Sequence, residues 1–223
     1  MVKSNPHGGR VYVWDLPLRL FHWSLPLLLA VSWISVELQA MKVHELSGYA
    51  MLTLLLFRLV WGVIGSRTAR FAYFVRGVPH TLEYARALRS KAAVKHIGHN
   101  PLGGWMVVLL LTVLLLQALT GLFSHDVSGT AGPLAGWVSY DASDWLTQFH
   151  SWNFDVLLGL VGIHLAAIAY YARVRGDNLV KPMLTGYKDV PHAHEPLHVA
   201  PLWQAVLLLA AAAAGVYALV SFA

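Results

Sequence analysis

The chain has 223 residues, of which 57% are hydrophobic and only 12% are charged. Soluble domains carry about 25% charged residues, so the composition excludes an ordinary soluble enzyme and indicates a membrane protein. The sequence has no cysteine, which excludes disulfides, thiolate metal sites, Cys-ligated iron–sulfur clusters and covalent c-type haem attachment. The net charge is +5, but the basic residues are grouped between apolar runs. We therefore interpret them as topology signals and expect no nucleic-acid partner.

Five apolar runs are long enough to cross a lipid bilayer, which takes about 20 residues. They cover residues 20–38, 47–65, 104–123, 153–172 and 201–221. A backbone in lipid must satisfy its own hydrogen bonds, so these runs predict helices. We expect an all-α integral membrane protein, with a four-helix transmembrane bundle followed by a fifth transmembrane helix. No small-residue cleavage site follows the first run, so we expect no cleaved signal peptide.

The lysine and arginine residues predict the orientation. Fourteen of the 16 lie before the first run or in the loops 66–102 and 173–200. The opposite side carries only Lys42, and Arg58 lies within the second run. The positive-inside rule then places the N-terminus in the cytoplasm and the C-terminus in the periplasm, in a bacterial inner membrane. Within loop 66–102 we expect an interfacial helical segment.

Four histidines lie in or at the ends of the predicted spans. His22 is near the start of the first helix, His44 is near the start of the second, and His150 and His164 belong to the fourth. The last two are 14 residues apart, which is about 21 Å along a helix and about 40° around it. One face of the fourth helix therefore presents a histidine near each membrane surface. Ionisable groups at these depths are costly and usually functional.

The topology pairs these histidines by depth. His22 should lie with His164 on the cytoplasmic side, and His44 with His150 on the periplasmic side. Two neutral imidazoles from opposite helices suit a six-coordinate haem iron that transfers electrons. A single histidine at a helix end is more often an ordinary interfacial residue. The four matched depths favour two haem sites, one near each surface of the membrane.

Neighbouring residues fit such sites, although alternative roles stay open for them. Gly48, one turn after His44, would leave room for a flat macrocycle, but close helix packing accounts for a glycine equally well. Arg58 and Arg19 could bind a haem propionate, because arginine recognises carboxylates well. The alternative for Arg58 is that its side chain extends to the membrane surface.

The remaining histidines are expected to be loop residues. A cluster with His192, His194, Glu195 and His198 could bind a metal ion. Its irregular ligand spacing favours a solvated linker instead. We also expect His99 to be an ordinary loop residue.

Four motifs surround these positions: VWDLPxRxFHW at 13–23, HExxGY at 44–49, FRLxWGxxGSR at 57–67 and GHNPLGG at 98–104. Together with the histidine pair of the fourth helix, they resemble the prokaryotic cytochrome b561 family. That family is similar to the membrane b subunits of nickel–iron hydrogenases and thiosulfate reductases. The resemblance covers most of residues 11–172.

The resemblance implies a four-helix core with two non-covalent b haems, whose axial ligands would be His22, His164, His44 and His150. It also implies electron exchange with a membrane quinone, ubiquinone or menaquinone, and with a second redox partner. We expect this di-haem core in residues 1–172, and a His-rich linker with the fifth helix in residues 173–223. Such an extension resembles that of partner-bound subunits.

Three functions remain open at this point. The first is an electron-transfer oxidoreductase subunit between the quinone pool and a periplasmic c-type cytochrome, hydrogenase or reductase module. The second is a superoxide:ubiquinone oxidoreductase that acts alone, which the acidic external loops disfavour because a positive funnel would steer superoxide. The third is a haem-free transporter or assembly factor, since intramembrane histidines also serve proton relays. A homodimer is compatible with each of them.

Overall fold

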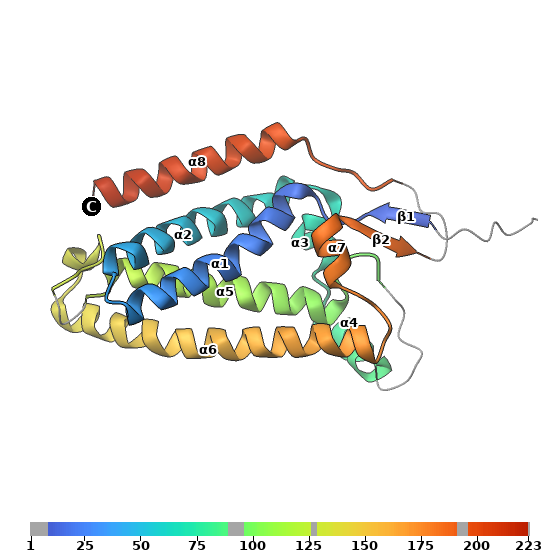
Figure 1. Ribbon diagram of the computed structural model, residues 1–223, viewed down its shortest axis with the longest axis horizontal. Coiled ribbons are helices and arrows are strands. Elements are labelled where there is room, and N and C mark those ends of the chain that lie inside the picture. The colour runs from blue at the N-terminus through green and yellow to red at the C-terminus, as the bar shows by residue number, and fades with distance from the viewer. Residues whose placement is uncertain (1–8, 89–95, 126–128, 191–195, 223) are drawn as a thin grey trace, which may run out of the picture.

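The computed structural model describes residues 9–88, 96–125, 129–190 and 196–222. Its long helices are α1 (Leu16–Glu37), α2 (Met41–Ile64), α5 (Pro101–Phe123), α6 (Tyr140–Arg173) and α8 (Leu202–Ser221). All five are long and apolar enough to cross a membrane. The first four form a bundle, and α8 lies along the outer side of α2 (Figure 1). The predicted all-α membrane fold is confirmed.

Short elements gather at one end of the bundle, which we call the sheet end (Figure 1). They are β1 (Gly9–Tyr12), the 3-10 turn η1 (Arg67–Ala69), α3 (Phe71–Phe74), α4 (Val78–Ala87), α7 (Val180–Thr185) and β2 (Tyr187–Val190). The opposite end, which we call the loop end, carries the α1–α2 turn and the α5–α6 connection with the 3-10 turn η2 (Ala135–Trp137). The helical segment expected within loop 66–102 is α4.

Helix starts follow from capping residues. The Asp15 carboxylate accepts a hydrogen bond from the Leu18 backbone N–H at 2.8 Å and begins α1. The Asn100 side chain accepts one from the Gly103 N–H and begins α5. Ser139 caps α6 in the same way, so this helix begins at Tyr140, before the apolar run 153–172, and includes His150 as expected. Hydropathy detects only the apolar span, whereas the helix continues through a polar stretch outside it.

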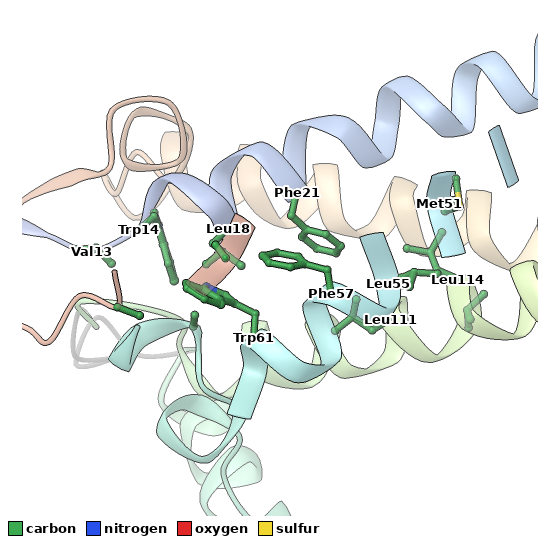
Figure 2. Packing of buried hydrophobic residues seen from close by; sticks show 14 of the residues in the cluster. Val13, Trp14, Leu18, Phe21, Met51, Leu55, Phe57, Trp61, Leu111 and Leu114 are labelled. Carbon is green, nitrogen blue, oxygen red and sulfur yellow. The ribbon is translucent and has the colours of Figure 1, made fainter. Parts of the chain in front are cut away.

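The apolar core joins α1, α2 and α5 (Figure 2). Its largest fully buried side chain is that of Trp61, which is 0% exposed. The indole N–H of Trp61 donates to the Asp15 carboxylate at 3.0 Å, and Phe57 stacks on the indole ring with a centroid distance of 5.6 Å. The residue that begins α1 is therefore fixed to the last turn of α2, and this contact positions the sheet end.

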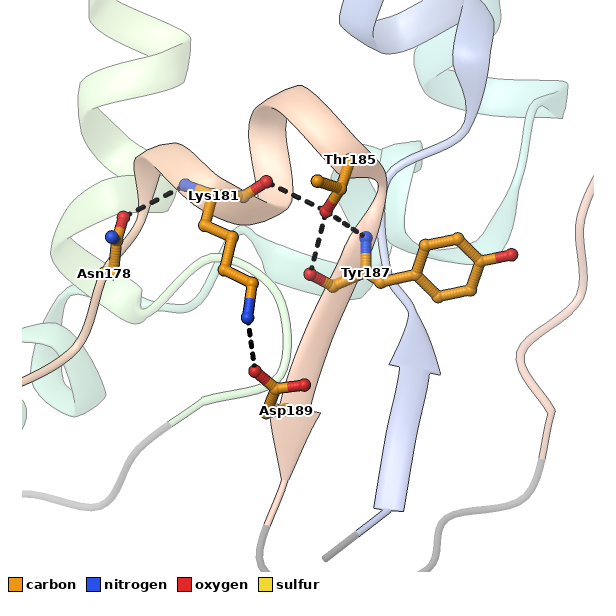
Figure 3. A network of polar contacts seen from close by, with 5 residues as sticks. All are labelled: Asn178, Lys181, Thr185, Tyr187 and Asp189. Carbon is orange, nitrogen blue, oxygen red and sulfur yellow. Dashed lines mark hydrogen bonds and ion pairs between the residues drawn. The ribbon is translucent and has the colours of Figure 1, made fainter.

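The two-stranded sheet ties the beginning of the chain to the segment before α8. Its antiparallel strands place Arg10 opposite Asp189. The turn into β2 passes through Gly186, whose positive φ of 85° favours glycine. Lys181 bridges α7 and β2 through an ion pair of 2.8 Å with Asp189 (Figure 3). This hydrogen-bonded partner lowers the pKa of the Asp189 carboxyl.

A close backbone approach holds the loop end together at Gly132. Its N–H donates to the Ser124 carbonyl at 2.8 Å. A Cβ atom at this position would lie 2.5 Å from the Gly121 carbonyl oxygen and closer still to that of Leu122. We expect Gly132→Ala to destabilise the protein by about 1–3 kcal/mol, because backbone atoms cannot yield easily. Thermal unfolding in detergent measures this.

Gly136 is the matched control, because a Cβ atom there would meet nothing within 4 Å. Gly136→Ala should leave the midpoint of unfolding unchanged. Equal midpoints for the two variants would contradict the assigned backbone contact.

Candidate functional site

The four predicted histidines lie as two pairs at opposite ends of the bundle. The ring centroids of His22 and His164 are 6.4 Å apart, and those of His44 and His150 are 6.1 Å apart. In each pair one ring comes from α6 and the other from α1 or α2. The structure thus brings together the residues that were paired by depth.

These separations suit a shared metal ion. A metal–imidazole bond is about 2 Å long, so two imidazoles on opposite sides of one metal have ring centroids about 6 Å apart. Both ring planes then contain the bond axis, which allows any angle between them. The observed angles of 54° and 76° are compatible with this arrangement.

Apolar side chains separate the two pairs along the bundle. On α6, Leu157 lies midway between His150 and His164, and it is only 1% exposed. On α2, Met51 lies midway between His44 and Arg58, and it is also buried. Residues seven apart share a helix face. Along one face of α6, and likewise of α2, two polar side chains are therefore separated by a buried apolar one.

At the loop end, hydrogen bonds define the tautomer of His44. Its Nδ1 atom lies 3.0 Å from both the hydroxyl and the carbonyl oxygen of Ser32. Because a carbonyl oxygen can only accept, Nδ1 carries the proton. The Nε2 atom then keeps its lone pair, as a metal ligand must.

His150 has the same tautomer for a different reason. Its Nδ1 atom lies 3.1 Å from the Thr120 hydroxyl oxygen, whose own proton is donated to the Leu116 carbonyl at 2.8 Å. The Thr120 oxygen must therefore accept from the His150 Nδ1–H, and Nε2 of His150 is left with a lone pair. Both Nε2 atoms of the loop-end pair therefore keep the lone pair that a metal ligand requires.

The sheet end contains several unsatisfied polar atoms. In the described part of the chain, the buried side-chain nitrogen or oxygen atoms without a hydrogen-bond partner are Arg19 Nε, His22 Nδ1, Arg58 Nη1 and His99 Nδ1. All four belong to the sheet end. Buried polar groups are nearly always satisfied, so such a cluster indicates a polar group that binds there.

Arg58 is buried and does not extend to the membrane surface, since it is only 1% exposed. Its guanidinium lies over the ring of Phe71 at 4.7 Å. The nearby Asp15 carboxylate is occupied by Leu18 and Trp61. Asp15 contributes negative charge near this buried cation, but the Arg58 Nη1 atom has no hydrogen-bond partner among the described residues. A haem propionate would supply one. The Arg19 Nη1 atom, by contrast, donates to the Leu184 carbonyl at 2.5 Å.

His99 was expected to be an ordinary loop residue, but its ring is packed into the sheet end. It lies between Trp14 and Phe74, with centroid distances of 4.6 and 4.5 Å. Burial, and then the positive charge of Arg58, lower the pKa of His99 to about 3, so the ring is neutral at physiological pH. Its position in the GHNPLGG motif was the available signal.

Glycines leave free space beside the histidines. A Cβ atom at Gly48, one turn from His44, would meet nothing within 4 Å, and the same is true at Gly159 and Gly162 on α6. Close helix packing therefore does not account for these three glycines. The helices α1 and α6, which carry the sheet-end pair, do not pack along each other as α1 and α2 do. This arrangement fits a flat macrocycle.

The linker histidines, for which a solvated segment was favoured over a metal site, fall largely outside the described residues, since His192, His194 and Glu195 lie there. The His198 carbonyl accepts from the Arg67 N–H at 3.0 Å. Among the residues that the structure describes, no three His, Cys, Asp or Glu side chains converge as metal ligands.

A buried amide joins α5 to α6 near the loop-end pair. The Asn153 side-chain N–H groups donate to the Val113 carbonyl at 3.0 Å and to the Gln117 side chain at 2.6 Å. Asn153→Ala removes both hydrogen bonds and leaves the buried Gln117 side-chain oxygen without this donor, so we expect a loss of about 1–3 kcal/mol of stability. Thermal unfolding in detergent tests this, with Gln148→Ala on the exposed side of α6 as the control. A control that is destabilised equally would contradict the assigned role.

The fold and the site define a class of protein: a multi-pass helical membrane protein with two opposed histidine pairs stacked across its bundle. Residues 13–186 match the prokaryotic cytochrome b561 family, and the chain belongs to that family. It is accordingly a membrane cytochrome of b type, a class that carries haem b.

Curated relatives share this class at modest identity. A probable Ni/Fe-hydrogenase B-type cytochrome subunit of Rhizobium leguminosarum bv. viciae is 25% identical over 236 residues, covering 84% of this chain and 96% of the relative. Subunits with the same description from Azotobacter chroococcum and Azotobacter vinelandii are each 26% identical over 216 residues, covering 80% of this chain and 88% of the relatives. No solved structure matches the chain significantly.

Proposed function

We propose that this protein is a di-haem cytochrome b that carries electrons across the bacterial inner membrane between the quinone pool and a periplasmic redox partner. The observation that carries the proposal is the presence of two histidine pairs, each with a centroid distance near 6 Å, at opposite ends of one bundle. Two such sites provide the two steps of a path across the membrane.

Each pair has an assigned task in this proposal. His22 with His164, and His44 with His150, would each hold one haem iron, and bound haem would supply one-electron redox chemistry. Two imidazoles from the protein at each iron would favour electron transfer over binding of a small substrate. Gly48 gives the macrocycle room beside His44. Arg58 and, less directly, Arg19 neutralise propionates at the sheet end.

The orientation assigns the two ends to two partners. The Lys and Arg bias places the sheet end in the cytoplasm and the loop end in the periplasm. The relatives are described as hydrogenase cytochrome subunits, which supports a hydrogenase module at the loop end, with a c-type cytochrome or a reductase as alternatives. The loop end offers exposed aromatic side chains for such a contact, including Trp137 and Tyr140.

Quinone exchange is proposed at the sheet end. A cavity of about 410 Å³ opens there, and its polar lining includes Tyr73, Arg76, His80 and His96. His99 lines the same cavity. Cavities of this size accept drug-sized ligands. A quinone ring bound there would contact His99 at the sheet end.

Spectroscopy of the purified protein tests the proposal. We expect two b haems per chain from the pyridine haemochrome and protein concentrations, and reduction of both by a quinol analogue or by a reduced hydrogenase module. Colourless protein from haem-replete cells would contradict the proposal and favour a haem-free transporter. Haem that none of these donors reduces would contradict the quinone-linked role.

A further inference from the structure

Two hydroxyl side chains of neighbouring helices face the ring nitrogens of the loop-end pair. Ser32 belongs to α1 and faces His44 of α2, whereas Thr120 belongs to α5 and faces His150 of α6. The His44 ring also has the Ser32 backbone carbonyl as a second acceptor. All four bundle helices thus contribute to this one site.

We propose that Ser32 and Thr120 are positioning residues that fix the tautomer and the ring planes of His44 and His150. The proposal rests on the proposed function, in which this pair binds a haem. A hydrogen bond from Nδ1–H to an oxygen makes the imidazole a stronger electron donor through Nε2. A stronger donor stabilises the ferric state. The two hydroxyl groups therefore lower the midpoint potential of the loop-end haem.

The direction of these hydrogen bonds is fixed by the surrounding helices. The Thr120 hydroxyl donates its proton to the Leu116 carbonyl, so its lone pair faces His150. The Ser32 carbonyl also accepts from the Ser35 hydroxyl at 2.7 Å, which holds it in place beside His44. Neither acceptor depends on a mobile loop, because both belong to membrane-spanning helices.

The backbone of α5 restricts the His150 ring further. A Cβ atom at Gly121 would lie 3.0 Å from His150 Cε1. The ring therefore rests against the helix backbone at Gly121 while Thr120 accepts its proton. Position and ring rotation are set together by two consecutive residues.

The sheet-end pair lacks this arrangement. The Nδ1 atom of His22 is buried and has no hydrogen-bond partner among the described residues. The effect of Ser32 and Thr120 should therefore be confined to one of the two haems. The other haem serves as an internal reference in the same molecule.

The test is a potentiometric titration of the two-haem protein, together with electron paramagnetic resonance of its ferric form. Thr120→Val keeps the shape of the side chain and removes the acceptor. We expect a higher potential for the loop-end haem and a changed or broadened low-spin ferric signal, while the sheet-end haem keeps both properties. Ser32→Ala removes only one of the two acceptors of His44, because the Ser32 carbonyl stays in place. It should therefore shift the potential in the same direction by a smaller amount, and the double variant should show the largest shift.

Two further variants separate positioning from mere packing. Thr120→Ser retains the hydroxyl and should restore the potential and the signal. Thr112→Val is the matched control, because Thr112 also lies on α5 and bonds only to the Val108 carbonyl. Loop-end properties that are unchanged in Thr120→Val, or changed equally in Thr112→Val, would overturn the proposal. In both cases two haems would still be present, so the proposed function would stand. Absence of haem from the wild-type protein would contradict both the proposed function and this inference.

Discussion

Replacing His150 with alanine is expected to halve the haem content of the purified protein, from two haems per chain to one. An iron that loses one of two axial imidazoles is held by a single protein ligand, and a non-covalent haem has no thioether bond to retain it. The pyridine haemochrome assay measures the loss. The same result is expected for His44→Ala, and for His22→Ala or His164→Ala at the other end.

Double variants make this prediction sharper. His44→Ala combined with His150→Ala removes both ligands of one site and should retain one haem. His22→Ala combined with His150→Ala damages both sites and should retain none. His125→Ala is the control, since this histidine also lies at the loop end but bonds to the Ser143 hydroxyl at 2.7 Å. Equal losses in the two double variants would show that the pairing is wrong.

Trp61→Ala is expected to have the largest effect on stability. The indole is completely buried and packs against Phe57 (Figure 2), and its N–H donates to Asp15. Replacing a buried tryptophan with alanine typically costs about 3–5 kcal/mol. Here it also leaves one buried oxygen of Asp15 without its donor. Thermal unfolding in detergent, followed by circular dichroism, should show a clearly lower midpoint.

Two other variants divide this effect into its parts. Trp61→Phe keeps most of the packing and removes only the N–H donor, so we expect a smaller loss of about 1–3 kcal/mol. Trp152→Ala removes a tryptophan side chain of α6 that is 63% exposed, and it should change the midpoint of thermal unfolding little. A Trp61→Ala variant as stable as Trp152→Ala would contradict the central position of this side chain.

The sequence was sufficient to predict what depends on helix length and periodicity. The five spans follow from hydropathy, and the pairing of His22 with His164 and of His44 with His150 follows from topology and from the 14-residue spacing. These features are local, or they follow from the alternating direction of consecutive spans. The comparison with the cytochrome b561 family agrees with the motifs around these histidines.

Other features depend on contacts between distant segments and could not be predicted in this way. The burial of Arg58 requires Phe71 and Asp15 to surround it. The position of His99 depends on Trp14, which precedes the first helix. The start of α6 at Tyr140 required the Ser139 cap to be recognised in a polar stretch. Neither hydropathy nor spacing contains this information.

The pairing of β1 with β2 has a consequence for the order in which the protein is completed. Arg10 lies opposite Asp189, so the first strand emerges from the ribosome early and remains without its partner until nearly all of the chain has been synthesised. Contacts between residues so far apart in sequence form late. All four paired histidines lie between β1 and β2 in the sequence. The sheet therefore closes a loop of chain that contains both histidine pairs.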